Sequence, residues 1–131
     1  MAVLIACTLI PLLLHAEEAA DCTIHAGSCT KQAGAYSVTL DISPKPVRHM
    51  ADLAFSLTVT PCTELPDTLV LDLSMPGMHM GLNRVFLSRT SGCTYRGKGI
   101  IVRCMSGRTL WRVTVLSPLL NNPSFTFNVR N

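Results

Sequence analysis

Residues 69–87, LVLDLSMPGMHMGLNRVFL, carry the pattern that decides the fold of this 131-residue chain. Leucine occupies positions 69, 71 and 73, and Val85 and Leu87 repeat the same spacing after the loop. Apolar side chains at every second position lie on one face of a strand. The stretch therefore predicts two strands that pack on a core and are joined by a loop starting at Pro76-Gly77.

The same alternation recurs on both sides of this stretch. Alternating apolar positions appear at 36–42, 55–59, 100–102, 111–115 and 125–129, and Gly, Pro and Ser residues separate the segments. Seven short strands in about 100 residues are typical of an immunoglobulin-like domain. We therefore expect an all-β chain: an immunoglobulin-like antiparallel β-sandwich of about seven strands.

The segment 94–103 allows two interpretations. Gly97 and Gly99 fit either a hairpin turn or one long strand that the glycines bend or bulge. We favour the single strand, because residues 105–108 already form a good turn before Trp111.

The first sixteen residues, MAVLIACTLIPLLLHA, contain no charged side chain and end before two glutamates. This segment is shorter than the ~20 residues that a membrane span needs, and it fits the apolar region of a secretory signal. We expect residues 1–16 to be a signal peptide or a short membrane anchor, 17–35 a cysteine-containing extension, and 36–131 the sandwich domain. The predicted location is the periplasm or cell envelope of a bacterium.

Five cysteines follow the N-terminal segment, and an exported chain of this size normally pairs most of its cysteines in disulfides. Connections between successive antiparallel strands alternate between the two ends of a sandwich. One end then receives residues 43–53, 74–82 and 104–109, and the other receives 61–67, 91–93 and 117–123.

This alternation places Cys62 beside Cys93 and leaves Cys22 and Cys29 as a local pair, with Cys104 as the spare thiol. Two alternatives stay open. A hairpin turn at 97–99 would place Cys93 opposite Cys104, and Cys104 can also pair with Cys22 or Cys29.

The loop SMPGMHMG, residues 74–81, carries the candidate chemistry. Pro76 and Gly77 are the central residues of a type II turn, which holds the flanking Cα atoms within ~7 Å. Thioethers are soft ligands that select copper, especially Cu(I). The predicted metal ligands are Met75, Met78, His79 and Met80.

The alternation of connections brings further candidate ligands to the same end: Cys104, Met105, His49 and Met50. The alternative interpretation gives the methionines no metal. In that case they fill the open end of the core or form an adaptable patch for a protein partner.

Charge is distributed unevenly along the chain. The net charge is +3, all eight acidic residues lie in 1–72, and residues 73–131 hold eight basic residues and no acid. Because the cations are scattered singly among few aromatics, we expect no nucleic-acid partner. There is no Gly-rich phosphate loop or G-x-S-x-G motif and no pair of carboxylates near His79, so we expect neither an enzyme nor a small-molecule substrate.

Residues 71–115 resemble the YtkA-like family of small exported bacterial β-sandwich domains, which is similar in layout to CopC-like and FixH-type periplasmic domains. The resemblance lies in the M-P-x-M-x-M loop at 75–80, the G-x-Y-x-G-x-G-like strand at 95–99, and the W-x-x-x-V strand at 111–115. It extends over about residues 36–129. It implies an immunoglobulin-like sandwich, the single-strand interpretation of 94–103, and copper handling.

The leading hypothesis is therefore an exported, non-enzymatic copper-binding carrier or buffer that holds Cu(I) on its methionine-rich loop. Its expected partner is a copper-handling or membrane-associated envelope protein. The alternative hypothesis is an envelope assembly or protein-interaction module that uses the same loop and a basic face without any metal.

Overall fold

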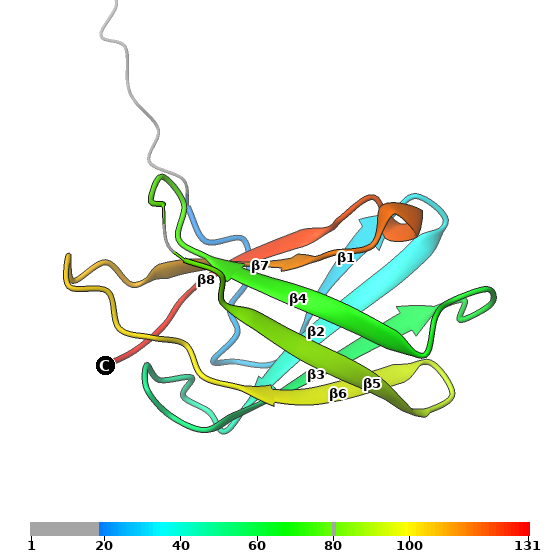
Figure 1. Ribbon diagram of the computed structural model, residues 1–131, viewed down its shortest axis with the longest axis horizontal. Helices are drawn as coiled ribbons and strands as arrows, with labels where there is room; N and C mark the ends of the chain where they lie inside the picture. The colour runs from blue at the N-terminus through cyan, green and yellow to red at the C-terminus, as the bar shows by residue number, and fades with distance from the viewer. Residues whose placement is uncertain (1–18, 80) are drawn as a thin grey trace, which may run out of the picture.

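The computed structural model describes residues 19–79 and 81–131, and it is built almost entirely from β-strands (Figure 1). The expected signal or anchor segment, 1–16, lies outside the described residues. The elements, in chain order, are β1 (Cys29–Ala33), β2 (Tyr36–Ser43), β3 (Leu53–Thr60), β4 (Thr68–Ser74), β5 (Arg84–Ser91), β6 (Thr94–Gly99), β7 (Leu110–Val115), the short 3₁₀ helix η1 (Pro118–Leu120) and β8 (Ser124–Asn128). Nowhere in the described part of the chain is a helix long and apolar enough to cross a membrane.

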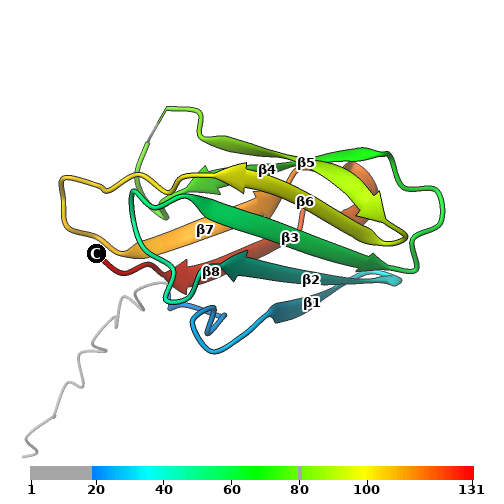
Figure 2. The same ribbon diagram turned by 90° about the horizontal axis from the view of Figure 1, so that it is seen from below.

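The strands form one antiparallel ladder in the order β1-β2-β3-β6-β5-β4-β7-β8. The ladder folds over on itself, so that β4 and β2 lie on opposite sides of the core (Figures 1 and 2). The expected all-β antiparallel sandwich is confirmed. Its largest fully buried side chains are aromatic: Trp111, Tyr95, Phe55, Phe125 and Phe127.

The seven expected strands correspond to β2–β8, and an eighth strand, β1, precedes them. Alternation predicted six of them because alternate side chains are buried along those strands, as at Leu69, Leu71 and Leu73. The alternation expected at 100–102 is wrong, because Ile100 and Val102 are exposed and Ile101 is buried. The sequence of β1, CTKQA, has no such apolar repeat, yet it pairs with β2 from Cys29↔Leu40 to Ala33↔Tyr36. The sandwich therefore includes residues that the sequence placed in an extension.

The segment after residue 94 forms one strand, as expected, but β6 ends at Gly99, so the expected strand positions 100–102 lie outside the sheet. The glycines allow β6 to approach β5 closely. A Cβ at Gly97 would lie 2.2 Å from the Phe86 carbonyl oxygen, and one at Gly99 would lie 2.5 Å from Val85 Cγ2. Ordinary Cβ contacts begin well beyond those distances, so both positions need glycine.

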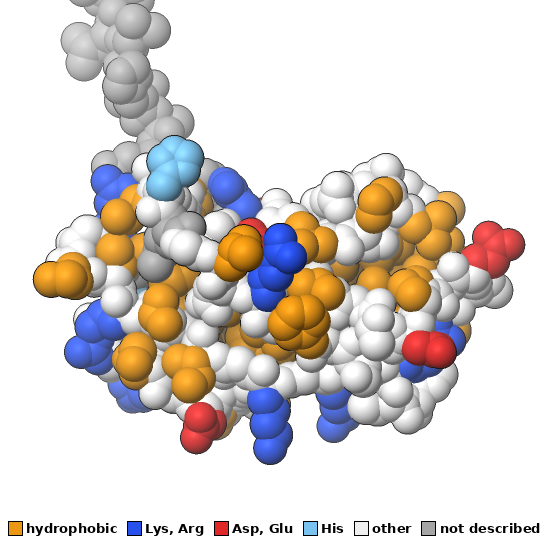
Figure 3. All heavy atoms as spheres, viewed as in Figure 1, with side chains coloured by type: hydrophobic (Ala, Val, Ile, Leu, Met, Phe, Trp, Pro, Cys, Tyr) orange, Lys and Arg blue, Asp and Glu red, His pale blue; other side chains and the backbone are white. Residues whose placement is uncertain are grey.

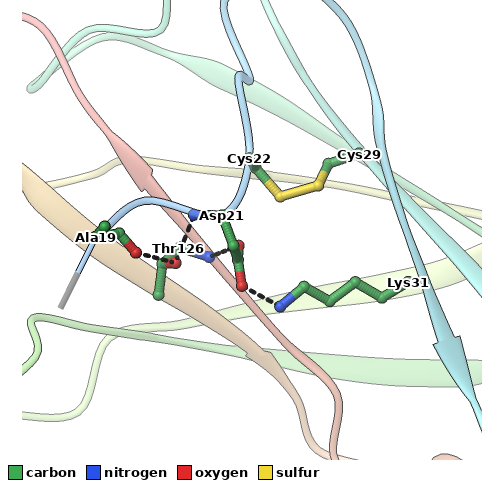
Figure 4. A network of polar contacts seen from close by, with 6 residues as sticks. All are labelled: Ala19, Asp21, Cys22, Cys29, Lys31 and Thr126. Atoms are coloured by element: carbon green, nitrogen blue, oxygen red, sulfur yellow. Dashed lines mark hydrogen bonds and ion pairs between the residues drawn. A yellow bond between two sulfur atoms is a disulfide. The ribbon is translucent and has the colours of Figure 1, made fainter.

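The N-terminal segment closes the gap between the edge strands β8 and β1 (Figure 4). The backbone N–H groups of Asp21 and Cys22 donate to the Thr126 carbonyl over 3.1 and 3.0 Å. In return the Thr126 N–H donates to the Asp21 carboxylate over 2.8 Å. Lys31 on β1 forms an ion pair with Asp21, and the Cys22–Cys29 disulfide joins the segment to β1.

Burial raises the pKa of Asp21, but hydrogen bonds from Lys31 and Thr126 outweigh it, so the pKa lies below its usual value. A carboxyl group whose pKa is lower in the folded state stabilises the fold above its unfolded pKa. That contribution is lost as the pH falls through the folded pKa. The attachment of the N-terminal segment to β8 therefore weakens in acid.

Loops gather at two opposite ends of the sandwich, as predicted (Figure 1). We call the end formed by loops 44–52, 75–83 and 100–109 the methionine end, and the end formed by 61–67, 92–93 and 116–123 the disulfide end. The predicted disulfides Cys62–Cys93 and Cys22–Cys29 are both present, and Cys104 is free. Two disulfides indicate a protein of a non-reducing compartment.

Gly97→Ala should destabilise the fold, because its Cβ would push β6 away from the β5 backbone. We expect a loss of about 1–3 kcal/mol in the free energy of unfolding, measured by urea denaturation. Gly27→Ala is the matched control, since no atom lies within 4 Å of its added Cβ. Equal stability of the two variants would show that the close approach of β6 to β5 does not require glycine at position 97.

Candidate functional site

The Pro-Gly turn of the methionine loop is confirmed, and it separates the two methionines that flank it. The Met78 N–H donates to the Met75 carbonyl over 3.1 Å, and Gly77 has a φ of 77°, as the third residue of a type II turn requires. Met75 points into the core and is only 2% exposed, whereas Met78 is half-buried at the surface. His79 is exposed, and Met80 lies outside the described residues.

Two sulfur atoms from different loops meet at this end. Cys104 Sγ lies 3.9 Å from Met78 Sδ. The Ser106 hydroxyl is 3.0 Å from Cys104 Sγ and 3.8 Å from Met78 Sδ. A tight turn holds the cysteine and the serine together, because the Gly107 N–H donates to the Cys104 carbonyl over 3.1 Å. We call Met78, Cys104 and Ser106 the sulfur cluster.

The surroundings of Cys104 favour its thiolate. Hydrogen bonds from the side chain and backbone of Ser106 lower the pKa of Cys104, and the positive charge of Arg108 lowers it further, against a smaller opposing effect of burial. The thiolate is the form of cysteine that binds metals and reacts with electrophiles. The sulfur cluster thus combines a thiol whose ionisation is favoured with a neutral thioether.

The spacing of the two sulfurs suits a single soft ion. Their 3.9 Å separation is less than twice a typical metal–thiolate bond of ~2.3 Å, so one ion can contact both. A thiolate with a thioether is a ligand pair that selects Cu(I) over harder cations. No three His, Cys, Asp or Glu side chains gather into a group suited to a metal ion anywhere in residues 19–79 and 81–131.

A groove of about 720 Å³ opens beside the methionine loop. Its lining includes Pro76, Gly77, Arg108, Thr109 and Ala19. Gly77 directly precedes Met78, and Arg108 follows Ser106 by two residues, so the groove and the sulfur cluster involve the same two loops.

His49, a further candidate ligand, has both ring nitrogens engaged in the fold. Trp111 Nε1 donates to His49 Nε2 over 3.0 Å inside the core, and His49 Nδ1 lies 3.0 Å from the Asn131 side-chain oxygen. An indole N–H can only donate, so Nε2 is the acceptor and Nδ1 carries the proton. The structure gives His49 a role in packing the loop 44–52 onto the core.

The remaining candidates, Met50 and Met105, share the methionine end with the sulfur cluster, and both side chains are largely exposed. Sequence reasoning did not single out Ser106 or Arg108. The proximity of Ser106 to Cys104 could have been predicted, because Ser106 stands two residues after Cys104 within a predicted turn. The contact of its hydroxyl with Met78, from another loop, was not predictable from that local pattern.

No protein-family model, curated protein or solved structure matches this chain. The resemblance to the YtkA-like family therefore stays a prediction.

His49→Leu should destabilise the protein by about 1–3 kcal/mol, because it leaves the buried Trp111 N–H without an acceptor. Urea denaturation followed by Trp111 fluorescence measures this loss. Met50→Leu, at the exposed neighbouring position, is the control and should change stability by less than about 0.5 kcal/mol. A His49→Leu variant as stable as the control would contradict the assigned role of the imidazole.

Ser106→Ala should raise the pKa of Cys104, because the thiolate loses its main hydrogen-bond donor. The rate of iodoacetamide alkylation, followed against pH in the native protein, should then have its midpoint at higher pH than in the wild type. Ser28→Ala, in the N-terminal segment, serves as the control. An unchanged midpoint in Ser106→Ala would refute the hydrogen-bond explanation.

Proposed function

We propose that this protein is an exported, non-enzymatic Cu(I) carrier or buffer of the bacterial cell envelope. The observation that carries the proposal is the contact between Met78 Sδ and Cys104 Sγ, 3.9 Å apart, at the rim of the sandwich. A free cysteine beside a methionine is an unusual pair to keep at the surface of a chain whose other described cysteines form disulfides. Soft-metal binding gives that pair a chemical purpose.

The proposed primary ligands are Met78 and Cys104. His79 follows Met78 directly and is exposed, so its imidazole is the next candidate, with Met80 as the candidate after it in the sequence. The sequence predicted Met75 as a metal ligand, but its side chain packs in the core. There it anchors the turn that presents Met78. Binding through Met75 would require that side chain to leave the core.

The position of the sulfur cluster suits a carrier better than a permanent metal site. Both sulfurs belong to half-buried residues of surface loops, and other residues of the same two loops line an open groove, so an incoming ligand from another protein can approach this end of the molecule. The proposed recipient is a copper-handling or membrane-associated envelope protein. The resemblance of residues 36–129 to YtkA-like domains is consistent with this proposal.

Replacing either sulfur should weaken Cu(I) binding. We expect Met78→Leu and Cys104→Ser each to raise the dissociation constant by about tenfold or more, since each removes one of two soft ligands. Anaerobic titration of the protein against a competing Cu(I) chelator measures the constant. Affinity should also fall as the pH drops, because Cu(I) competes with a proton for the Cys104 thiolate.

Met105→Leu is the matched control, because this methionine lies next to Cys104 in sequence but its side chain is fully exposed. Its affinity should stay within about twofold of the wild type. If Met78→Leu binds Cu(I) as tightly as Met105→Leu, the proposed site is wrong.

A further inference from the structure

Apolar side chains are exposed mainly at the methionine end. Eight large hydrophobic side chains are exposed in the described part of the chain, and five of them belong to the three loops of this end: Met50, Leu82, Ile100, Val102 and Met105. Leu82 is 82% exposed and Met105 is fully exposed. Folded proteins rarely leave such side chains together in water unless they meet another surface.

Basic residues accompany these apolar side chains. The three loops hold four Lys or Arg residues and one acid, Asp52. Lys45 forms an ion pair with Asp41, and Arg48 donates to the Asn131 backbone oxygen. Arg103 and Arg108 are exposed beside Val102 and Met105. Figure 3 shows orange hydrophobic and blue basic side chains next to each other at its left end, where these loops gather. The methionine end is therefore both apolar and positively charged.

The chain also enters the sandwich at this end. Ala19, the first described residue, lines the same groove as Pro76, Gly77 and Arg108. Upstream of it in the sequence, residues 2–14 are without charge. In the sequence, an apolar stretch thus precedes Ala19 by only a few residues.

We propose that the methionine end docks on a lipid bilayer that contains anionic phospholipid. Side chains such as Leu82, Val102 and Met105 enter the boundary between headgroups and acyl chains, while Arg103 and Arg108 contact lipid phosphates. A protein interface has its apolar residues in a central cluster with a polar rim. Here the apolar residues stand on three separate loops, and two exposed arginines share the loop 100–109 with Val102 and Met105, a pattern that suits the headgroup region of a bilayer.

Binding to vesicles tests this inference. The full chain carries Leu12→Ser, Leu13→Ser and Leu14→Ser, so that the N-terminal segment contributes little, and a chelator removes copper. Co-sedimentation is measured with phosphatidylcholine vesicles alone and with vesicles holding about 30% phosphatidylglycerol. We expect binding to the anionic vesicles to exceed that to the neutral ones by about tenfold and to fall with added salt.

In the same background, Leu82→Ser, Val102→Ser and Met105→Ser together should raise the lipid concentration for half-binding by about tenfold. Leu116→Ser with Leu119→Ser, which removes two exposed leucines of the disulfide end, should change it by less than about twofold. All five positions are exposed, so both variants should fold, and far-UV circular dichroism verifies this.

Equal binding of the two variants would overturn the proposal, and so would equal binding to neutral vesicles. Absence of binding to either vesicle would overturn it as well and would favour a protein as the partner of this end. Because copper is absent throughout, none of these results depends on the proposed Cu(I) site.

Discussion

Backbone hydrogen bonds attach Asp21 and Cys22 to Thr126 on β8, and the Cys22–Cys29 disulfide ties the same short segment to β1. These strands are the two edges of one folded-over sheet. Unpaired edges expose N–H and C=O groups and leave a core open between them. A few residues therefore close the core between the two edges of the ladder, and the loops of the methionine end extend from the strands that lie between those edges.

The methionine loop places a core side chain and a surface side chain on either side of one turn. Met75 is part of the core, and the Pro-Gly turn reverses the chain so that Met78 faces the loop that carries Cys104. On the other side of the same end, His49 fixes the loop 44–52 through Trp111. The proposed Cu(I) site would therefore stand on packed residues, as a preformed binding site requires.

Much of this architecture is predictable from the sequence, because a strand that buries alternate side chains has apolar residues at every second position of its sequence. The alternation of loops between ends followed from the strand count and correctly paired Cys62 with Cys93. What the sequence could not reveal depends on contacts between distant residues. The strand β1 has no apolar repeat, the Trp111–His49 bond links residues 62 positions apart, and the burial of Met75 follows from how the core closes.

The candidate site was predictable as a set of residues at one end, but its geometry was not. The sequence placed Met78 and Cys104 at the same end of the sandwich, and their side chains are in contact there. Ser106 and Arg108 lower the pKa of the Cys104 thiol, and the positions of their side chains follow from no spacing rule. Met80, placed in the predicted ligand set by the same reasoning, lies outside the described residues.

The loop between β4 and β5 joins two strands that are direct neighbours, and their register from Thr68↔Ser88 to Asp72↔Arg84 does not depend on the residues between them. The residues that hold the loop to the fold are Met75, Met78 and Asn83, which pack against the core or bond to the backbone of β4 or of the loop itself. Substitutions at positions 79, 81 and 82, between these points, would therefore change the exposed side chains with little effect on the core. The loop is the part of the molecule where new specificity can arise at the least cost in stability.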